Sequence, residues 1–312
     1  MHSLLSKSYF FLYSALILLS LTRLFAQDES ESTLPFDAVI QSEMGGKRFK
    51  FYGNTRFNFN QAYFSNWISG GESALTLLYG LDYYFNYSDR KGLVWDTNLL
   101  LSLGTTYISG SKYLKKADDR FEINSLVGKQ INTYWNYSGF LNFKTQLLPG
   151  FKFFTQEGIE QRERVSKFLS PAILQGGLGF YYKKNQDLWL NLSPVSARVI
   201  IVSKRFTNSL SEGEKYFGVE ANKRSKFFFG ALISGFFKKE IMNNIIWENK
   251  YSFYVNYLEK TKNIDFDWNS NMRFKVNSKI SGNFILHLLY DDDLIGKLQV
   301  RELLGLGVNI DL

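Results

Sequence analysis

The feature that most constrains this chain is an alternation of apolar and polar residues with a period of two, sustained over long segments. Between Ile264 and Asn277, apolar side chains such as Phe266 and Phe274 occupy one face, and polar side chains fill the other. This pattern predicts a β-strand with one apolar and one polar face. Strands of soluble proteins average roughly five to six residues, whereas these segments are about twice that length or more. We therefore favour a transmembrane barrel over a soluble β-sandwich, the alternative for such a pattern.

Twelve segments of the chain show this alternation. The predicted fold is an all-β, transmembrane antiparallel up-and-down β-barrel of about 12 strands in residues 49–312. Each segment exceeds the roughly 9–11 residues that a tilted strand needs to cross a bilayer. The predicted strands lie near residues 50–63, 73–88, 92–107, 118–131, 134–148, 172–184, 187–204, 225–240, 243–259, 262–277, 280–291 and 297–312.

The connections between these segments alternate in length. Tight turns are predicted at residues 88–91, 184–187, 241–243 and 277–279, and long connections at 108–117, 149–171 and 206–224. Bacterial barrels have short periplasmic turns, longer external loops and an even strand count. The pattern therefore predicts that both ends of the barrel domain lie in the periplasm. The stretch 156–167, rich in charges, is expected to form either a short external helix or a solvated loop.

The first 26 residues predict a cleaved secretory signal peptide. Lys7 precedes an uncharged apolar stretch from Tyr9 to Leu21, shorter than the roughly 20 residues of a membrane-spanning helix. Ala26 is a small residue suited to the last position before the cut, although Leu24 is large for a cleavage site. Residues 27–48 would form a periplasmic N-terminal segment. Together with the barrel pattern, the signal predicts the outer membrane of a Gram-negative cell.

The composition fits a barrel wall. Aromatic residues make up 17% of the chain, which has only four prolines and no cysteine. Proline removes a donor from a strand ladder, so a chain of paired strands confines it to ends and loops. Once Lys7 and Arg23 leave with the signal, 35 Lys and Arg stand against 29 Asp and Glu, too dispersed to predict a nucleic-acid partner. The expected partners are outer-membrane lipid, the barrel-assembly machinery during biogenesis, and an envelope protein of unknown identity.

The polar face of each predicted strand should point into the lumen once the sheet closes. Two interpretations of this polar lining remain open: a polar core of mutually paired charges that fills the barrel, or a lined conduit for a polar solute. Eight-stranded barrels are filled by side chains and sixteen-stranded ones hold a channel, so twelve strands lie between. The lumen-lining candidates are Arg56, Asn58, Asp82, Asp96, Arg120, Glu122, Lys144, Gln146, Glu248, Lys250, Asp265, Asp267, Arg273 and Lys275.

The sequence offers little for catalysis. His287 is the only histidine after the signal, and it falls on the inward face. Ser281 is six residues away, roughly 20 Å along a strand, too far to pair with it as a nucleophile. Asp291, Asp292 and Asp293 are expected to be solvated loop charges rather than a metal site. We therefore expect no enzyme activity, no cofactor and no metal.

The last predicted strand contains one exception to its apolar face. Glu302 shares that face with residues such as Val300 and Leu304. Either Glu302 lies at the membrane interface, where a carboxylate costs little, or a bulge shifts the phase of the strand.

One segment resembles a known family. The stretch Phe64-Ser65-Asn66-Trp67-Ile68-Ser69-Gly70-Gly71, supported by residues 116–122 and 143–146, resembles the domain of unknown function 3078 family. The resemblance covers nearly the whole chain after the signal and implies an outer-membrane barrel, but it brings no activity with it. Phe64, Asn66, Trp67, Gly70 and Gly71 would form the first external loop.

The functional expectation is a porin-like barrel that acts as a narrow channel or transporter for a small polar solute. The alternative is a structural or partner-binding barrel without transport activity, and an outer-membrane enzyme is a distant third.

Overall fold

The computed structural model describes residues 48–65, 72–89, 91–259, 261–277, 279–292 and 296–311. The predicted signal peptide and all but the last residue of the predicted periplasmic segment lie outside these residues. No described helix is long and apolar enough to cross a membrane.

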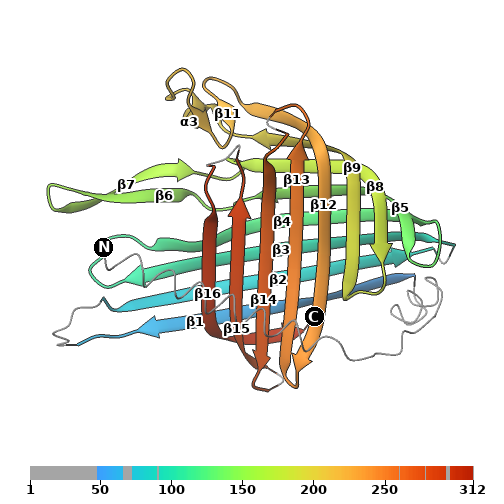
Figure 1. Cartoon of the computed structure of the whole chain (residues 1–312). Coiled ribbons are helices and arrows are strands. Elements are labelled where there is room, and N and C mark those ends of the chain that lie inside the picture. The colour runs from blue at the N-terminus through green and yellow to red at the C-terminus, as the bar shows by residue number, and fades with distance from the viewer. Residues whose placement is uncertain are drawn as a thin grey trace, which may run out of the picture. The chain divides into compact units, whose positions relative to one another are not determined.

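Twelve strands form one closed antiparallel barrel (Figure 1), which confirms the predicted fold. Each is hydrogen-bonded to its neighbours around the barrel, and β1 pairs with β16 to close it. Strands of the front wall cross those of the opposite wall steeply, as expected for tilted barrel strands. The barrel strands are β1 (Phe49–Ala62), β2 (Ala74–Ser88), β3 (Leu93–Ile108), β4 (Lys115–Gln130), β5 (Trp135–Thr145), β8 (Ala172–Lys183), β9 (Leu188–Ile201), β12 (Ser225–Met242), β13 (Ile245–Asn256), β14 (Ile264–Lys275), β15 (Ile280–Tyr290) and β16 (Gln299–Asp311).

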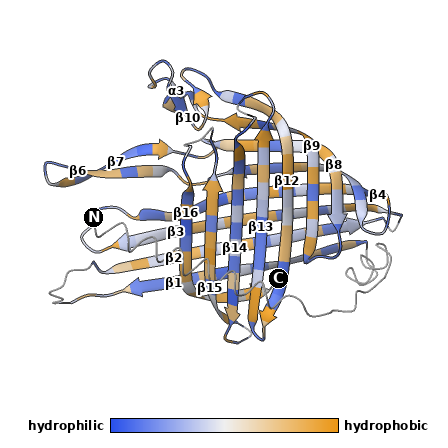
Figure 2. Ribbon diagram, viewed as in Figure 1, coloured by the Kyte–Doolittle hydropathy of each residue, from blue (hydrophilic) through white to orange (hydrophobic). Residues whose placement is uncertain are grey.

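The outer surface of the barrel is apolar. Hydrophobic and hydrophilic residues alternate along the strands (Figure 2), because successive side chains of a strand point to opposite faces. Large apolar side chains remain exposed on every wall, with 58% of Phe51, 67% of Leu178 and 68% of Leu304 accessible. A water-exposed surface rarely carries so continuous an apolar face.

The two ends of the barrel differ in their connections. We call the tight-turn end the one that joins β2–β3, β4–β5, β8–β9, β12–β13 and β14–β15, and the long-connection end the other. Both β1 and β16 have their outer ends, Phe49 and Asp311, at the tight-turn end. The alternation of connection length is therefore present as predicted.

The long connection between β5 and β8 differs from the prediction. It contains a β-hairpin of β6 (Gly150–Gln156) and β7 (Ile159–Ser166), which we call the arm. The expectation of a helix or solvated loop at 156–167 was therefore wrong. Glu157 and Gly158 both have positive φ at the turn, which lets β6 and the charged strand β7 pair. The arm projects from the long-connection end (Figure 1).

The connection between β9 and β12 also folds at the long-connection end. It holds the short helix α3 (Lys204–Thr207) and the strand pair β10 (Lys215–Tyr216) and β11 (Val219–Glu220). Val219 is fully buried there.

β9 contains a bulge, whereas β16 does not. Pairing shifts on both sides of β9 around Pro194, a bulge where the missing proline donor is tolerated. In contrast, β16 pairs with β15 and β1 without a shift, and Glu302 lies opposite Leu286 on the exposed outer face. Glu302 is the fourth residue of β16 from the long-connection end, so the interface alternative fits and the bulge alternative was wrong.

Candidate functional site

The inward face of the barrel carries ion pairs along neighbouring strands. Arg56 of β1 lies 2.7 Å from Asp82 of β2, and Glu248 of β13 lies 3.5 Å from Arg273 of β14. These pairs follow the wall, so they neutralise charge without blocking the interior.

A second set of contacts crosses the lumen. Lys144 of β5 lies 3.1 Å from Asp267 of β14, although four strands separate β5 from β14 along the shorter path around the barrel. Asp267 also contacts His287 at 2.9 Å, and Lys144 is 3.8 Å from Glu122, the partner of Arg120. Opposite charges thus meet in the interior and bridge strands that are not neighbours.

Arg198 is the centre of a further cluster toward the long-connection end. Its guanidinium lies 2.7 Å from Asp265 and 3.2 Å from Asp291, at the end of β15. The same group stacks over the rings of Phe228 and Tyr254, 4.8 and 4.3 Å from their centroids. A guanidinium suits this position because its plane can stack while its edge binds carboxylates.

An apolar cluster covers this charged group. It consists of Ile200, Val202, Val219, Phe228, Leu232 and Tyr254, all buried, with Tyr216 and Phe217 packed against them. Val219, Tyr216 and Phe217 come from the connection between β9 and β12. The other five residues of the cluster lie in β9, β12 and β13 or directly follow β9. The folded connection therefore packs against β9, β12 and β13 on this side of the long-connection end.

The half of the lumen toward the tight-turn end contains a cavity of about 230 Å³. It reaches the turn between β8 and β9 at Gln186, and its deep end is bounded by Lys144 and Asp267. Aromatic side chains line two sides. Tyr52 and Tyr84 stack with ring centroids 4.9 Å apart, and Trp189 and Phe236 stack at 6.2 Å.

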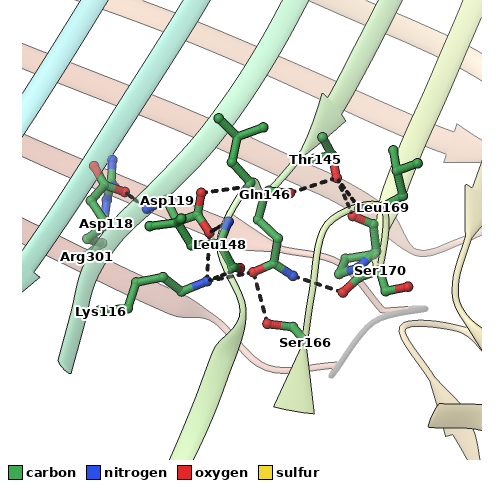
Figure 3. A network of polar contacts seen from close by, with 12 residues as sticks. Lys116, Asp118, Asp119, Thr145, Gln146, Leu148, Ser166, Leu169, Ser170 and Arg301 are labelled. Atoms are coloured by element: carbon green, nitrogen blue, oxygen red, sulfur yellow. Dashed lines mark hydrogen bonds and ion pairs between the residues drawn. The ribbon is translucent and has the colours of Figure 1, made fainter. Parts of the chain in front are cut away.

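The base of the arm is fastened to the barrel rim (Figure 3). Lys116 donates to Asp119 and Gln146, both at 2.8 Å, and Gln146 donates to the Ser170 carbonyl at 2.9 Å. The Ser166 hydroxyl donates to Gln146 at 2.9 Å. Gln146, a lumen-lining candidate, therefore lies at the rim just after β5 and holds the arm, because β5 ends at Thr145 rather than at residue 148.

The other candidates fall in several places. Asp96 pairs with Lys183 at 2.7 Å, and Lys250 lines the cavity. Asn58 packs over Gly307, where a Cβ would come within 1.9 Å of its amide oxygen. Lys275 is exposed at the tight-turn end of β14. The remaining candidates, described above, lie in ion pairs of the lumen.

The predicted external loop is only partly visible. The Phe64 amide donates to the Ser73 hydroxyl at 2.9 Å, so the two ends of the connection meet. Asn66, Trp67, Gly70 and Gly71 lie outside the described residues. Within the described ranges, no group of three or more His, Asp or Glu side chains could hold a metal ion.

Sequence reasoning missed Arg198 and the apolar cluster. The inward positions of β9 change from odd numbers, such as Asn191, to even numbers, such as Arg198, at the Pro194 bulge. A strict period of two cannot follow that change. The signal that could have found it was Pro194 itself, since a proline within a strand marks a bulge or an edge.

Comparisons with solved structures return barrels at low similarity. The translocator domain of the autotransporter NalP from Neisseria meningitidis is 7% identical, with 88% of this chain and 92% of that chain covered and a TM-score of 0.35. The COG4313 outer membrane channel from Pseudomonas putida F1 is 10% identical, with 92% and 98% covered and a TM-score of 0.36. The β domain of the Bordetella autotransporter BrkA is 7% identical, with 85% and 98% covered and a TM-score of 0.30.

Sequence comparisons are more limited. No curated protein sequence matches this chain. One family model matches part of the chain, over a shorter region than expected, since the resemblance was expected to cover nearly the whole chain after the signal. Residues 59–151 match the model described as protein of unknown function (DUF3078), which confirms the resemblance over the segment that carries its motifs.

Proposed function

We propose that this protein is an outer-membrane β-barrel that serves as a narrow, normally closed conduit for a small polar solute. The membrane part of the proposal rests on the continuous apolar outer face, since a closed sheet with all strands paired is one of two structures that lipid tolerates. The tight-turn end then faces the periplasm, as in bacterial barrels.

The conduit part rests on the lumen. Polar and charged side chains line it from the rim to the tight-turn end, and a cavity of about 230 Å³ occupies one half. One observation carries the proposal: the Lys144–Asp267 contact crosses the lumen and bridges two distant strands. A lysine and an aspartate held together by charge form a barrier that can separate when the flexible lysine side chain swings away.

Fractionation tests the location. We expect the protein to sediment with outer membranes and to migrate faster on a gel when unheated than when boiled, because a closed barrel resists detergent. Recovery as a soluble periplasmic protein would refute the membrane proposal.

Flux through proteoliposomes tests the conduit. We expect slow permeation of glycine and glucose through the wild type and a several-fold increase in the double variant Lys144→Ser, Asp267→Ser. The control is the double variant Glu248→Ser, Arg273→Ser, which removes a pair of opposite charges that follows the wall. Equal flux through both double variants and the wild type would count against a conduit gated by the crossing pair.

A partner-binding barrel is the second candidate, and the arm is the observation that favours it. β6 and β7 pair only with each other, so both outer edges can accept a strand. The arm is nevertheless ordered at its base by the rim contacts of Lys116 and Gln146. Deletion of residues 151–165 leaves flux unchanged under either function, so complementation of a knockout strain separates them. The conduit predicts that the shortened barrel still complements, whereas a partner-binding role predicts that complementation is lost.

Catalysis is not part of this proposal. His287 contacts Asp267, and no described hydroxyl is hydrogen-bonded to the His287 ring. A nucleophile activated by that imidazole would need such a contact.

A further inference from the structure

The cavity at the tight-turn end has an unbalanced set of charges. Three carboxylates line it, and each has its own cation: Asp96 pairs with Lys183, Glu122 with Arg120, and Asp267 with Lys144. Lys250 also lines the cavity. No described carboxylate lies within ion-pair distance of its ammonium.

Neutral polar side chains beside Lys250 also lack a partner among the described residues. Lys250 and Asn269 are register partners on β13 and β14, and Ser234 and Ser252 are register partners on β12 and β13. All four line the cavity, and none of the four side chains is hydrogen-bonded to another described group. They form one patch of one ammonium, one amide and two hydroxyls, which we call the donor patch.

The rest of the cavity is built differently. Tyr52 and Tyr84 present stacked rings, and Trp189 and Phe236 present another stacked pair. Aromatic rings offer flat apolar surface with little loss of side-chain entropy on binding. A volume of about 230 Å³ equals that of roughly eight waters in the liquid, which is the size range of a small organic acid.

We propose that this cavity binds a small organic anion, a carboxylate on a flat or hydroxylated body, with the anionic group on Lys250 and Asn269. A half-buried ammonium that faces a cavity without a carboxylate partner favours an anionic ligand, and the local carboxylates are already neutralised. Hydroxyls of the ligand would meet Ser234 and Ser252, and its body would lie along the rings. The inference deepens the proposed conduit by naming its solute class, and it rests on that proposal for the route by which the anion reaches the cavity.

Ligand-observed NMR titration of the full barrel in detergent micelles tests the site. The probes are benzoate and lactate, with benzamide and lactamide as their neutral counterparts. We expect at least one of the two anions to bind about ten-fold more tightly than its amide, the size of effect of one charge-assisted hydrogen bond. Lys250→Met should reduce the anion to the affinity of the amide.

Lys279→Met is the matched control, because Lys279 is an exposed cation in a turn at the same end of the barrel. It should leave anion binding unchanged, and heat-dependent gel mobility reports that each variant is folded. Failure of both anions to bind the folded wild type, or anion binding that survives Lys250→Met, would overturn the inference. Neither outcome depends on a membrane, so a failed binding test is distinguishable from a failed flux test.

Discussion

The two ends of the lumen differ in how their charged side chains are paired. Toward the long-connection end, Arg198 is enclosed by two carboxylates and two rings, and an apolar cluster that includes Val219 lies over it. Toward the tight-turn end, Lys250 and its neighbours face a cavity whose described carboxylates each pair with another cation. The first end pairs its charged groups with one another, whereas the second leaves some of its polar groups open to the cavity.

This difference shows how one strand pattern can produce two kinds of interior. One is the group of Arg198, its carboxylates and the apolar cluster over it, which we call the plug, and the other is an open cavity. Inward side chains at both ends are drawn from the same alternation, but the bulge at Pro194 changes which residues of β9 point inward. Beyond the bulge the inward positions are Ser196, Arg198 and Ile200, and they complete the plug. Before it they are Trp189 and Asn191, which line the cavity.

The largest effect should come from breaking the plug. Arg198→Met removes the cation that contacts both Asp265 and Asp291, and removing one partner of a buried ion pair costs about 3–5 kcal/mol. We expect the free energy of unfolding, measured by urea titration in lipid vesicles, to fall by that amount. The control, Arg164→Met on the arm, should change it by less than about 0.5 kcal/mol. Equal effects would mean that Arg198 does not hold the plug together.

Removing a cation at the tight-turn end should lower the free energy of unfolding by less. Lys183→Met leaves Asp96 without its cation, but that carboxylate lines the cavity and can be hydrated there. We expect a loss of about 1–3 kcal/mol in the same urea titration. A loss as large as that of Arg198→Met would show that the tight-turn end is packed as tightly as the plug, and would remove the contrast between the ends.

The smallest effect concerns the arm, which lies outside the barrel wall. The Ser111 hydroxyl, the Lys112 amide and Lys115 hold the pKa of Glu160 below its ordinary value of about 4.3. Because the folded pKa is depressed, the contacts are fully present above the ordinary value and are lost as the pH falls through the depressed one.

Hydrogen exchange at the Lys112 amide measures this loss. We expect its protection, corrected for intrinsic rates, to fall below pH 4 in the wild type. In Glu160→Gln, protection should be weaker and independent of pH across the same range. A pH dependence that persists in Glu160→Gln would show that another group controls the base of the arm.

Much of the fold follows from local pattern. The segment 264–275 forms β14 with the predicted faces, and all twelve predicted strands have a counterpart, because alternation and turn chemistry act over neighbouring residues. The contacts of the site were harder to predict from the sequence. Lys144 and Asp267 were predicted to face inward, but their contact depends on how the barrel curves, which joins residues 123 positions apart.

The remaining surprises have physical reasons. Arg198 was missed because the Pro194 bulge reverses the phase of β9. The arm was missed because four of the eight residues of β7 are charged, and the sequence pattern for a strand assumes one apolar face. In the arm, Phe151 instead stacks under Arg162, 4.3 Å from the ring centroid, so a charged residue supplies the packing.

Single-channel recording in planar bilayers tests the closed lumen most directly. For the wild type we predict no steady ohmic current at low voltage, because the Lys144–Asp267 contact spans the lumen. The double variant Lys144→Ser, Asp267→Ser should show discrete openings that the wild type lacks. A steady open-pore current through the wild type, unchanged in that variant, would contradict the account.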